Sequence, residues 1–344
     1  MGLLEQLKGR YKVLSIVGMA KNAGKTTALN YILEEAMDEG MLLGVTSTGR
    51  DGESSDLVTG TEKPRVFLDA GTLVSVPTQL YEMADAGLEI LKMTDYSTAI
   101  GDLMICRVAD SGYVQIAGPL NIQAHKKLCR EMLDMGAEMI LIDGAIDRKS
   151  IAAPEASDAI ILATGAVLSR SLKKVVEETA HTVNLYTLPV EDNPEIRRIL
   201  EESGEGEKIL TISTQETGRK VTLPAIQTGL GASRYLDEAI GAETEYLYIP
   251  GALTKNVLAD IHPKKLKQVI ILTKDPTRIF IDVHSWQQMV KRGLRVKVLA
   301  NIEVAAVTVN PFSPQGYAFD TEQLTGELRC VLPDIPVVDV KRAF

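Results

Sequence analysis

Runs of consecutive apolar residues recur along the first half of the chain and predict buried strands. The run at 13–17 ends at Gly18, and similar runs lie at 41–47, 139–142 and 159–163. Unbroken apolar runs are typical of strands that are covered on both faces, as in a parallel sheet. We therefore expect a parallel sheet in this part of the chain.

Between these runs, apolar residues recur at the spacing of amphipathic helices. From Leu29 to Ala36 they lie at positions i, i+3, i+4 and i+7, and Gly40 ends the pattern. The same spacing predicts helices at 122–135 and 171–179. Strands that alternate with helices predict a doubly wound parallel α/β sheet.

Two segments interrupt this alternation. Residues 48–118 contain only short β-like pieces, and we interpret them as a β-rich insertion in a first domain that covers 1–195. The segment 191–208 is rich in Glu and Gly and predicts a domain boundary, so we expect a second, smaller α/β domain over 205–344. The further strands expected are at 72–77, 103–108, 113–117, 183–188, 246–249, 269–272, 280–283, 296–299 and 305–309, and the further helices at 285–292 and 322–332.

Composition narrows the choice of partners. The chain has 344 residues, 37 Lys and Arg against 46 Asp and Glu, and a net charge of −9, so general binding to nucleic acid is disfavoured. Its three cysteines are far apart, which fits a reducing compartment and offers no disulfide framework or zinc motif. The most apolar stretch, 156–168, contains Asp158 and is too short to span a bilayer. We expect a soluble cytoplasmic protein with neither nucleic acid nor membrane as partner.

The strongest chemical signal follows the first predicted strand and opens the first predicted helix. A nucleotide's phosphates need several inward-facing backbone N–H groups, hence small residues, and a helix N-terminus that favours anions. Lys25 would neutralise the phosphates, the Thr26 hydroxyl would bind Mg²⁺, and Lys21 is a second candidate for phosphate contact. The pattern G-x-x-x-x-G-K-[ST] is not met strictly, because Met19 stands where glycine is required. The residues concerned are Gly18-Met19-Ala20-Lys21-Asn22-Ala23-Gly24-Lys25-Thr26-Thr27.

Two acidic positions are candidates for organising Mg²⁺. Asp143 ends the apolar run 139–142, where a Walker B acid would lie, although a helix N-cap is the alternative. Asp51, within Gly49-Arg50-Asp51-Gly52-Glu53, could also help to bind the metal, and Arg50 could contact the γ-phosphate. A solvated turn explains this second cluster equally well.

Other candidate residues carry weaker signals. No Asn-Lys-x-Asp guanine motif occurs, which favours ATP over GTP as the nucleotide. Asn310-Pro311 could meet a base or an effector, but a turn explains it better. The pair Asp147-Arg148 could form a switch segment or a surface pair, and 262–267 could be a solvated helix face or a docking patch. The four histidines lack the spacing of metal ligands.

These motifs resemble those of known families. The loop is similar to the wider class of P-loop proteins that includes dethiobiotin synthetase, the molybdopterin-guanine dinucleotide accessory proteins and the cobalamin-enzyme chaperones. Longer phrases resemble the ATPase subunits of lysine 5,6-aminomutase reactivases, through most of the first 190 residues and more loosely beyond. These phrases are 15–27, 49–53, 56–64, 111–119 and 142–145.

The resemblance implies a function that composition and spacing do not. It implies a P-loop ATPase fold in 1–195 and ATP-driven release of damaged cobalamin from an adenosylcobalamin-dependent aminomutase, with a companion reactivase subunit as another partner. We expect Mg-ATP hydrolysis to rely on Lys25, Asp143 and Asp51, and we leave a homodimer open. Two alternatives remain: an ATP-dependent ligase of the dethiobiotin synthetase type, and a nucleotide-binding regulator.

Overall fold

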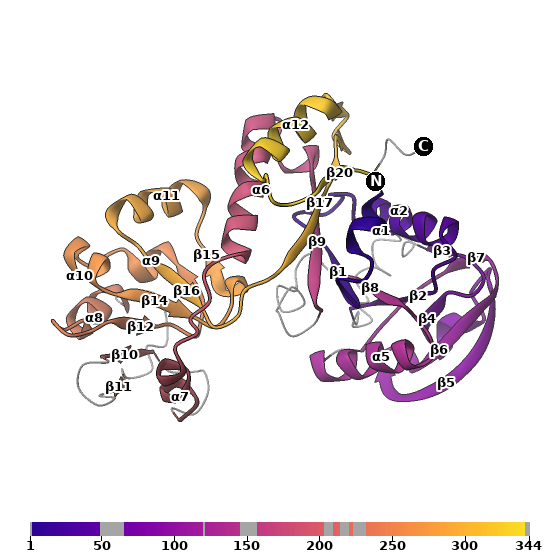
Figure 1. Ribbon diagram of the computed structural model, residues 1–344, viewed down its shortest axis with the longest axis horizontal. Coiled ribbons are helices and arrows are strands. Elements are labelled where there is room, and N and C mark those ends of the chain that lie inside the picture. The colour runs from indigo at the N-terminus through magenta and orange to yellow at the C-terminus, as the bar shows by residue number, and fades with distance from the viewer. Residues whose placement is uncertain are drawn as a thin grey trace. The chain divides into compact units, whose positions relative to one another are not determined.

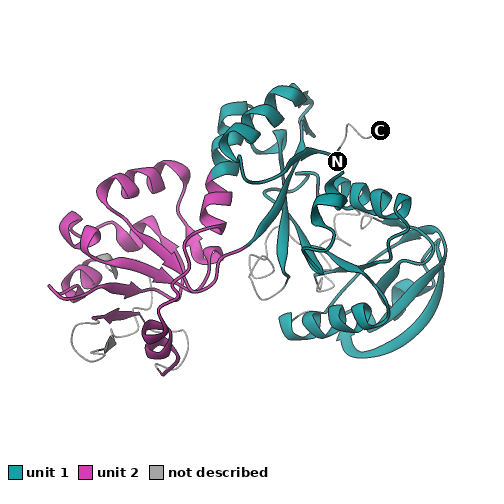
Figure 2. Cartoon of the chain, viewed as in Figure 1, with its two compact units in different colours: residues 1–180, 303–344 teal, residues 181–302 magenta. Residues whose placement is uncertain are grey.

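The computed structural model describes residues 2–48, 65–119, 121–144, 157–202, 209–213, 220–222 and 232–340. The chain divides into two compact units, of which unit 1 contains 1–180 and 303–344 and unit 2 contains 181–302 (Figure 2). Among the described residues, no helix combines the length and the apolar character needed to cross a membrane.

Unit 1 is built on a nine-stranded, mostly parallel sheet (Figure 1). From β20 to β4 all neighbours are parallel, and β6 and β5 then extend the sheet in antiparallel fashion. In sheet order the strands are β20 (Val337–Asp339), β17 (Val304–Asn310), β9 (Ala159–Gly165), β1 (Val13–Gly18), β8 (Met139–Asp143), β2 (Leu43–Ser47), β4 (Leu73–Pro77), β6 (Gly101–Asp110) and β5 (Gly87–Thr98).

Helices pack on both faces of this sheet, as a doubly wound fold requires. On one face, Leu29 and Ile32 of α2 join Leu14 and Ile16 of β1 in one buried cluster. On the other, α5 packs with the alternate side chains of β8 in a second cluster. The helices of unit 1 are α1 (Leu3–Leu7), α2 (Lys25–Asp38), α4 (Thr78–Tyr81), α5 (Ile122–Asp134), the 3-10 turn η2 (Ala166–Leu168), α6 (Leu172–Tyr186), which continues into unit 2, and α12 (Thr321–Val331).

The predicted β-rich insertion at 48–118 is not a separate body where the structure describes it. β4, β6 and β5 belong to the central sheet, because β4 pairs directly with β2 through Gly44–Leu73 and Val45–Val74. Two short antiparallel ribbons lie outside the sheet: β3 (Val66–Leu68) with β7 (Gly112–Val114), and β18 (Phe312–Ser313) with β19 (Tyr317–Ala318).

The predicted second domain at 205–344 is wrong at its carboxyl end. Residues 303–344 return to unit 1, where β17 pairs with β9 and β20 pairs with β17. The apolar run of β17 is buried almost throughout, as expected of a strand inside a parallel sheet whose two faces are covered. The carboxyl end of the chain thereby contributes to the same sheet edge as β1 and β9.

Unit 2 has its own five-stranded sheet, in the order β11-β10-β12-β14-β16. One buried cluster holds α7 and another holds α8, α10 and α11. The strands are β10 (Leu210–Ile212), β11 (Lys220–Thr222), β12 (Tyr246–Tyr248), β14 (Ile270–Thr273) and β16 (Val296–Val298), with a separate pair β13 (Leu253–Thr254) and β15 (Ile279–Phe280). The helices are α7 (Pro194–Glu202), α8 (Ala232–Ala239), α9 (Lys255–Leu258), α10 (Pro263–Gln268), η3 (Pro276–Arg278) and α11 (Val283–Arg292).

Two predicted strands are wrong in this region. Residues 183–188 continue helix α6 to Tyr186, because the buried positions Val175, Thr179 and Val183 keep helical spacing. Residues 280–283 form only the end of β15, and Asp282 then caps α11 by accepting from the Ser285 N–H. A capping aspartate starts a helix in place of a longer strand.

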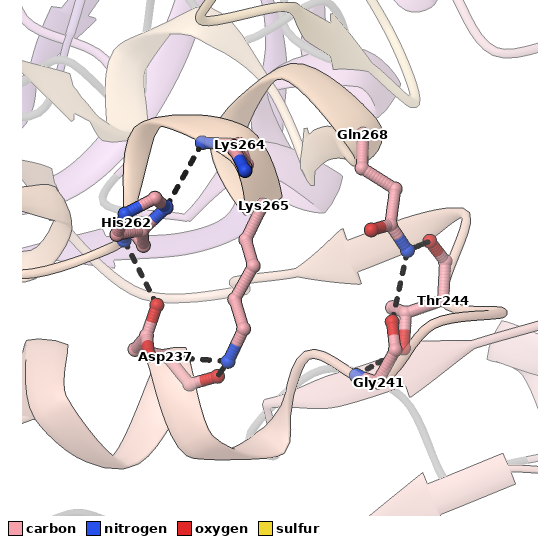
Figure 3. Close-up of polar contacts among 7 residues, drawn as sticks. All are labelled: Asp237, Gly241, Thr244, His262, Lys264, Lys265 and Gln268. Atoms are coloured by element: carbon pink, nitrogen blue, oxygen red, sulfur yellow. Dashed lines mark hydrogen bonds and ion pairs between the residues drawn. The ribbon is translucent and has the colours of Figure 1, made fainter.

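Two residues of the basic stretch at 262–267, His262 and Lys265, hold helix α10 in place through Asp237 (Figure 3). Lys265 Nζ lies 3.1 Å from Asp237 Oδ2, and the His262 N–H donates to Asp237 Oδ1 at 2.8 Å. Gln268 Nε2 donates to three carbonyl oxygens, those of Gly241, Ala242 and Thr244. These bonds fasten α10 to α8 and to the turn before β12, so only part of the stretch is a solvated face.

A buried carboxylate ties the start of unit 2 to the edge strand β16. Glu191 is 2% exposed, and its Oε2 lies 3.0 Å from Lys297 Nζ. Burial alone raises the pKa of Glu191, but hydrogen bonds from the Asn193 N–H and from the Lys297 and Tyr246 side chains outweigh burial and lower it. The ionised and paired carboxylate therefore stabilises this part of unit 2.

Replacing Lys297 by Met should lower the free energy of unfolding by about 2 kcal/mol, because the buried Glu191 carboxylate loses its cation. The loss stays below that of a fully buried pair, because the Lys297 side chain is 31% exposed. Urea denaturation followed by circular dichroism measures it, with Lys291→Met as the control, since Lys291 is exposed at the end of α11. Equal stability of the two variants would contradict this account.

Candidate functional site

The connection between β1 and α2 forms a loop with two left-handed residues. Asn22 has φ 65° and Gly24, the N-cap of α2, has φ 103°. The Met19 N–H donates to Ala163 O at 2.9 Å, which anchors the start of the loop to β9. Left-handed turns before a helix direct successive N–H groups toward one side, and this geometry binds anions. The 14-residue helix α2 presents its N-terminal turn at the same place.

Lys25, the first residue of α2, folds back over the loop. A side-chain carbon on Gly18 would lie 3.0 Å from Lys25 Cγ, so any larger residue would have to displace the lysine stem at this position. Lys25 Nζ donates to Gly144 O, at the carboxyl end of β8. The ammonium group therefore lies between the loop that joins β1 to α2 and the residue that follows Asp143.

Asp143 occupies the edge of the sheet where β1, β8 and β2 end. It pairs in register with Ile16 of β1 and with Ser47 of β2. The Gly144 N–H donates to Ile16 O at 3.0 Å, and the Thr48 N–H donates to Asp143 O at 3.1 Å. Asp143 is half-buried, and the structure thus brings together the predicted loop 18–27 and the predicted acid.

The remaining predicted residues fall into two groups. Within the loop, Lys21, Asn22 and Thr26 are exposed, Thr27 is half-buried and Ala23 is buried. Asp51, the rest of the cluster 49–53, and Asp147 with Arg148 lie outside the described residues. Their part in the site stays a prediction.

Asn310, for which the sequence favoured a turn over contact with a base or an effector, contacts the loop. Its Nδ2 donates to Asn22 O at 3.4 Å, and a side-chain carbon on Gly24 would lie 3.0 Å from Asn310 Cβ. Asn310 Oδ1 in turn accepts from the Phe312 N–H at 3.2 Å, which fixes the amide orientation. The available signal was a polar amide placed directly after a buried strand, but the expected domain boundary assigned it to another unit.

In the described part of the chain, other nucleophiles and metal ligands do not gather into a second site. No cluster of His, Cys, Asp and Glu suited to a metal occurs where the structure describes the chain. Burial raises the pKa of the Cys106 thiol to about 11 and that of Cys129 to about 12, so both stay protonated. His181 and His262 serve the fold, by bonding Ile281 O and by capping α10.

Comparison with known proteins adds no assignment: no protein-family model, no curated protein and no solved structure matches this chain.

His125 makes the stability of the fold sensitive to acid. The side chain is 6% exposed, and burial lowers its pKa below the usual 6.5 despite a hydrogen bond with Ser47 O. Between its folded and unfolded pKa values the unfolded chain binds the extra proton, so the free energy of unfolding falls as pH drops below about 6.5.

Replacing His125 by Gln should shrink the loss of unfolding free energy between pH 7.5 and 5.5, because Gln carries no titrating proton. Chemical denaturation at both pH values measures the loss. Replacing the exposed His284 by Gln is the control and should leave the loss unchanged. An identical pH dependence in wild type and the His125→Gln variant would show that His125 contributes nothing to it.

Proposed function

We propose that this protein is a P-loop ATPase that couples hydrolysis of Mg-ATP to conformational change. One observation carries the proposal: Lys25 reaches from the first residue of α2 across Gly18 to Gly144 O, beside Asp143. A cation, a helix N-terminus and an acid thus meet at the carboxyl edge of parallel strands, the usual place for ligands in such sheets.

The residues present fit a triphosphate. The left-handed Asn22 and Gly24 turn the loop so that main-chain N–H groups can surround a phosphate, and α2 adds the positive end of its dipole. An ammonium group has three donors, so Lys25 can bond a phosphate oxygen while it keeps a main-chain partner. Its charge would stabilise the negative charge that develops on the transferred phosphoryl group.

The residues that would hold the metal are Thr26, Asp143 and, by the sequence prediction, Asp51. Mg²⁺ bound there would neutralise charge on the β- and γ-phosphates. The chain's own part is to fix the acid: Asp143 is held by main-chain bonds to β1 and β2 on either side. Oxygen ligands of this kind are those that Mg²⁺ prefers.

The biological role we propose is reactivation of an adenosylcobalamin-dependent aminomutase by release of damaged cobalamin. Support for this partner comes from the resemblance of the phrases at 49–53, 56–64 and 111–119 to reactivase ATPases. Unit 2, with its own sheet and core, is a suitable place for binding the mutase, a companion subunit or an effector. Hydrolysis would act through the segment around Asp51, which follows β2 directly in the chain.

Replacing Lys25 by Ala should reduce ATP hydrolysis by at least about 100-fold. The variant lacks the ammonium group that would stabilise the negative charge on the transferred phosphoryl group. Circular dichroism and thermal unfolding should match wild type. The control is Lys12→Ala: Lys12 is exposed and precedes the amino end of β1, at the opposite edge of the sheet. Steady-state phosphate release with Mg-ATP measures both variants.

Hydrolysis by the Lys25→Ala variant at the wild-type rate would refute the site. Repeating the assay with inactivated aminomutase separates the partner from the site: hydrolysis without stimulation, and without exchange of damaged cobalamin, would refute the reactivase role alone. Turnover that requires a small carboxylate substrate would favour the ligase alternative.

Replacing Asn310 by Ala should weaken ATP binding by about tenfold, because the loop loses a donor to Asn22 O. The variant keeps Cβ and therefore keeps the contact with Gly24, so it isolates the amide group. Calorimetric titration with a non-hydrolysable ATP analogue measures affinity, and Asn301→Ala, an exposed amide in unit 2, is the control. Equal affinity in both variants would exclude Asn310 from the site.

A further inference from the structure

A single peptide group connects Asp143 to helix α5. The Thr48 N–H donates to Asp143 O at 3.1 Å, and the carbonyl oxygen of Ser47 lies 2.9 Å from His125 Nε2. The Ser47 carbonyl and the Thr48 N–H belong to the same planar trans peptide, so they point in opposite directions. The His125 imidazole therefore bonds the carbonyl side of the Ser47–Thr48 peptide, and the N–H side of the same peptide bonds the Asp143 carbonyl.

The Ser47 carbonyl needs a hydrogen-bond partner from outside the sheet, because β4 does not pair with β2 at this position. The pairing of β2 with β4 ends at Val45 and Val74, so no β4 residue pairs with Ser47. Gly118 fills the space: a side-chain carbon there would overlap Ser47 O and would lie 3.0 Å from His125 Nε2. His125 is thus the donor that satisfies a buried acceptor at the end of β2.

Hydroxyl groups of Ser47 and Ser75 also hold the segment before Gly118 against the ends of β2 and β4. Ser75 Oγ donates to Ala117 O and lies 2.6 Å from Thr46 Oγ1. Ser47 Oγ donates to Ile116 O at 3.4 Å. The segment just before Gly118 is therefore fastened to both β2 and β4, and the whole assembly is tied to the strand that precedes Asp51.

The protonation state of His125 follows from its partners. A carbonyl oxygen only accepts, so the proton is on Nε2, while Nδ1 is buried and has no partner among the described residues. Asn121 caps α5 by accepting from the Ala124 N–H at 2.8 Å, which fixes the helical turn that carries the ring. The imidazole is therefore a neutral donor in a fixed orientation.

We propose that His125 is a positioning residue for the Mg²⁺ site of the proposed ATPase, acting through the Ser47–Thr48 peptide on the backbone of Asp143. This inference rests on the proposed function. It assigns to α5, which contributes none of the predicted site residues, the task of fixing the acid relative to Lys25. Partners that orient a metal ligand from outside commonly change metal affinity by 10- to 100-fold when removed.

The test compares two replacements of His125. Leu fills a similar volume but cannot donate, whereas Gln places an amide N–H near the position of Nε2. The half-saturating Mg²⁺ concentration for ATP hydrolysis should rise about tenfold in His125→Leu and return to near the wild-type value in His125→Gln. Affinity for ATP in EDTA should be the same in all three proteins, because phosphate binding belongs to the loop 18–27.

Cys129→Ala is the matched control. Cys129 lies one turn further along α5 and is buried on the same helix face, in the cluster that contains Ile140 and Ile142 of β8. This variant should lose stability in thermal unfolding without a change in Mg²⁺ dependence. If His125→Leu does not fold, His125→Asn replaces it, because the shorter amide cannot reach Ser47 O.

Three outcomes overturn the inference. The first is an unchanged half-saturating Mg²⁺ concentration in folded His125→Leu or His125→Asn. The second is an equal change of that concentration in the Cys129→Ala control. The third is a failure of His125→Gln to restore the wild-type value. A wild-type protein that binds no ATP would refute the proposed function, and this inference with it, whereas the first three results leave the ATPase intact.

Discussion

The parallel register between β1 and β8 is the constraint on which the site depends. Ile16 pairs with Asp143, so the strand that leads into the loop 18–24 and the strand that ends in an acid terminate at the same edge. Gly18 then leaves space for the Lys25 stem to cross that edge and reach Gly144 O. A shift of the register by one residue would turn the Asp143 side chain to the other face of the sheet.

The carboxyl-terminal part of the chain also contributes to the sheet edge at which the site lies, on the side of β1 opposite to β8. β17 pairs with β9, which pairs with β1, and Asn310 at the end of β17 contacts Asn22 and Gly24 of the loop. Gly165 at the end of β9 has no room for a side chain beside the Asn310 carbonyl. Unit 2 is consequently an insertion between two strands of one sheet. The chain joins unit 2 to β9 through α6 at one end and to β17 at the other end.

The sequence was most informative where burial is complete. Strands β1, β8 and β9 and helix α2 were predicted because long apolar runs and helical spacing leave little choice at those positions. Edge strand β5 was missed because many of its residues are exposed and register shifts interrupt its alternation. The stretch 183–186 was misassigned because Val183 and Leu185 also fit the alternation of a strand, although Val183 continues the helical spacing of Val175 and Thr179. The return of β17 to the first sheet, and with it the position of Asn310, depends on pairing between residues nearly 150 positions apart, which local patterns do not encode.

The central claim is that main-chain amides between Gly18 and Thr27 surround the phosphates of a nucleotide. Hydrogen exchange with and without a Mg²⁺-bound, non-hydrolysable ATP analogue tests this most directly. The account predicts slower exchange in peptides that cover 18–28 and 142–144. No change in these peptides, or protection confined to 181–302, would contradict it.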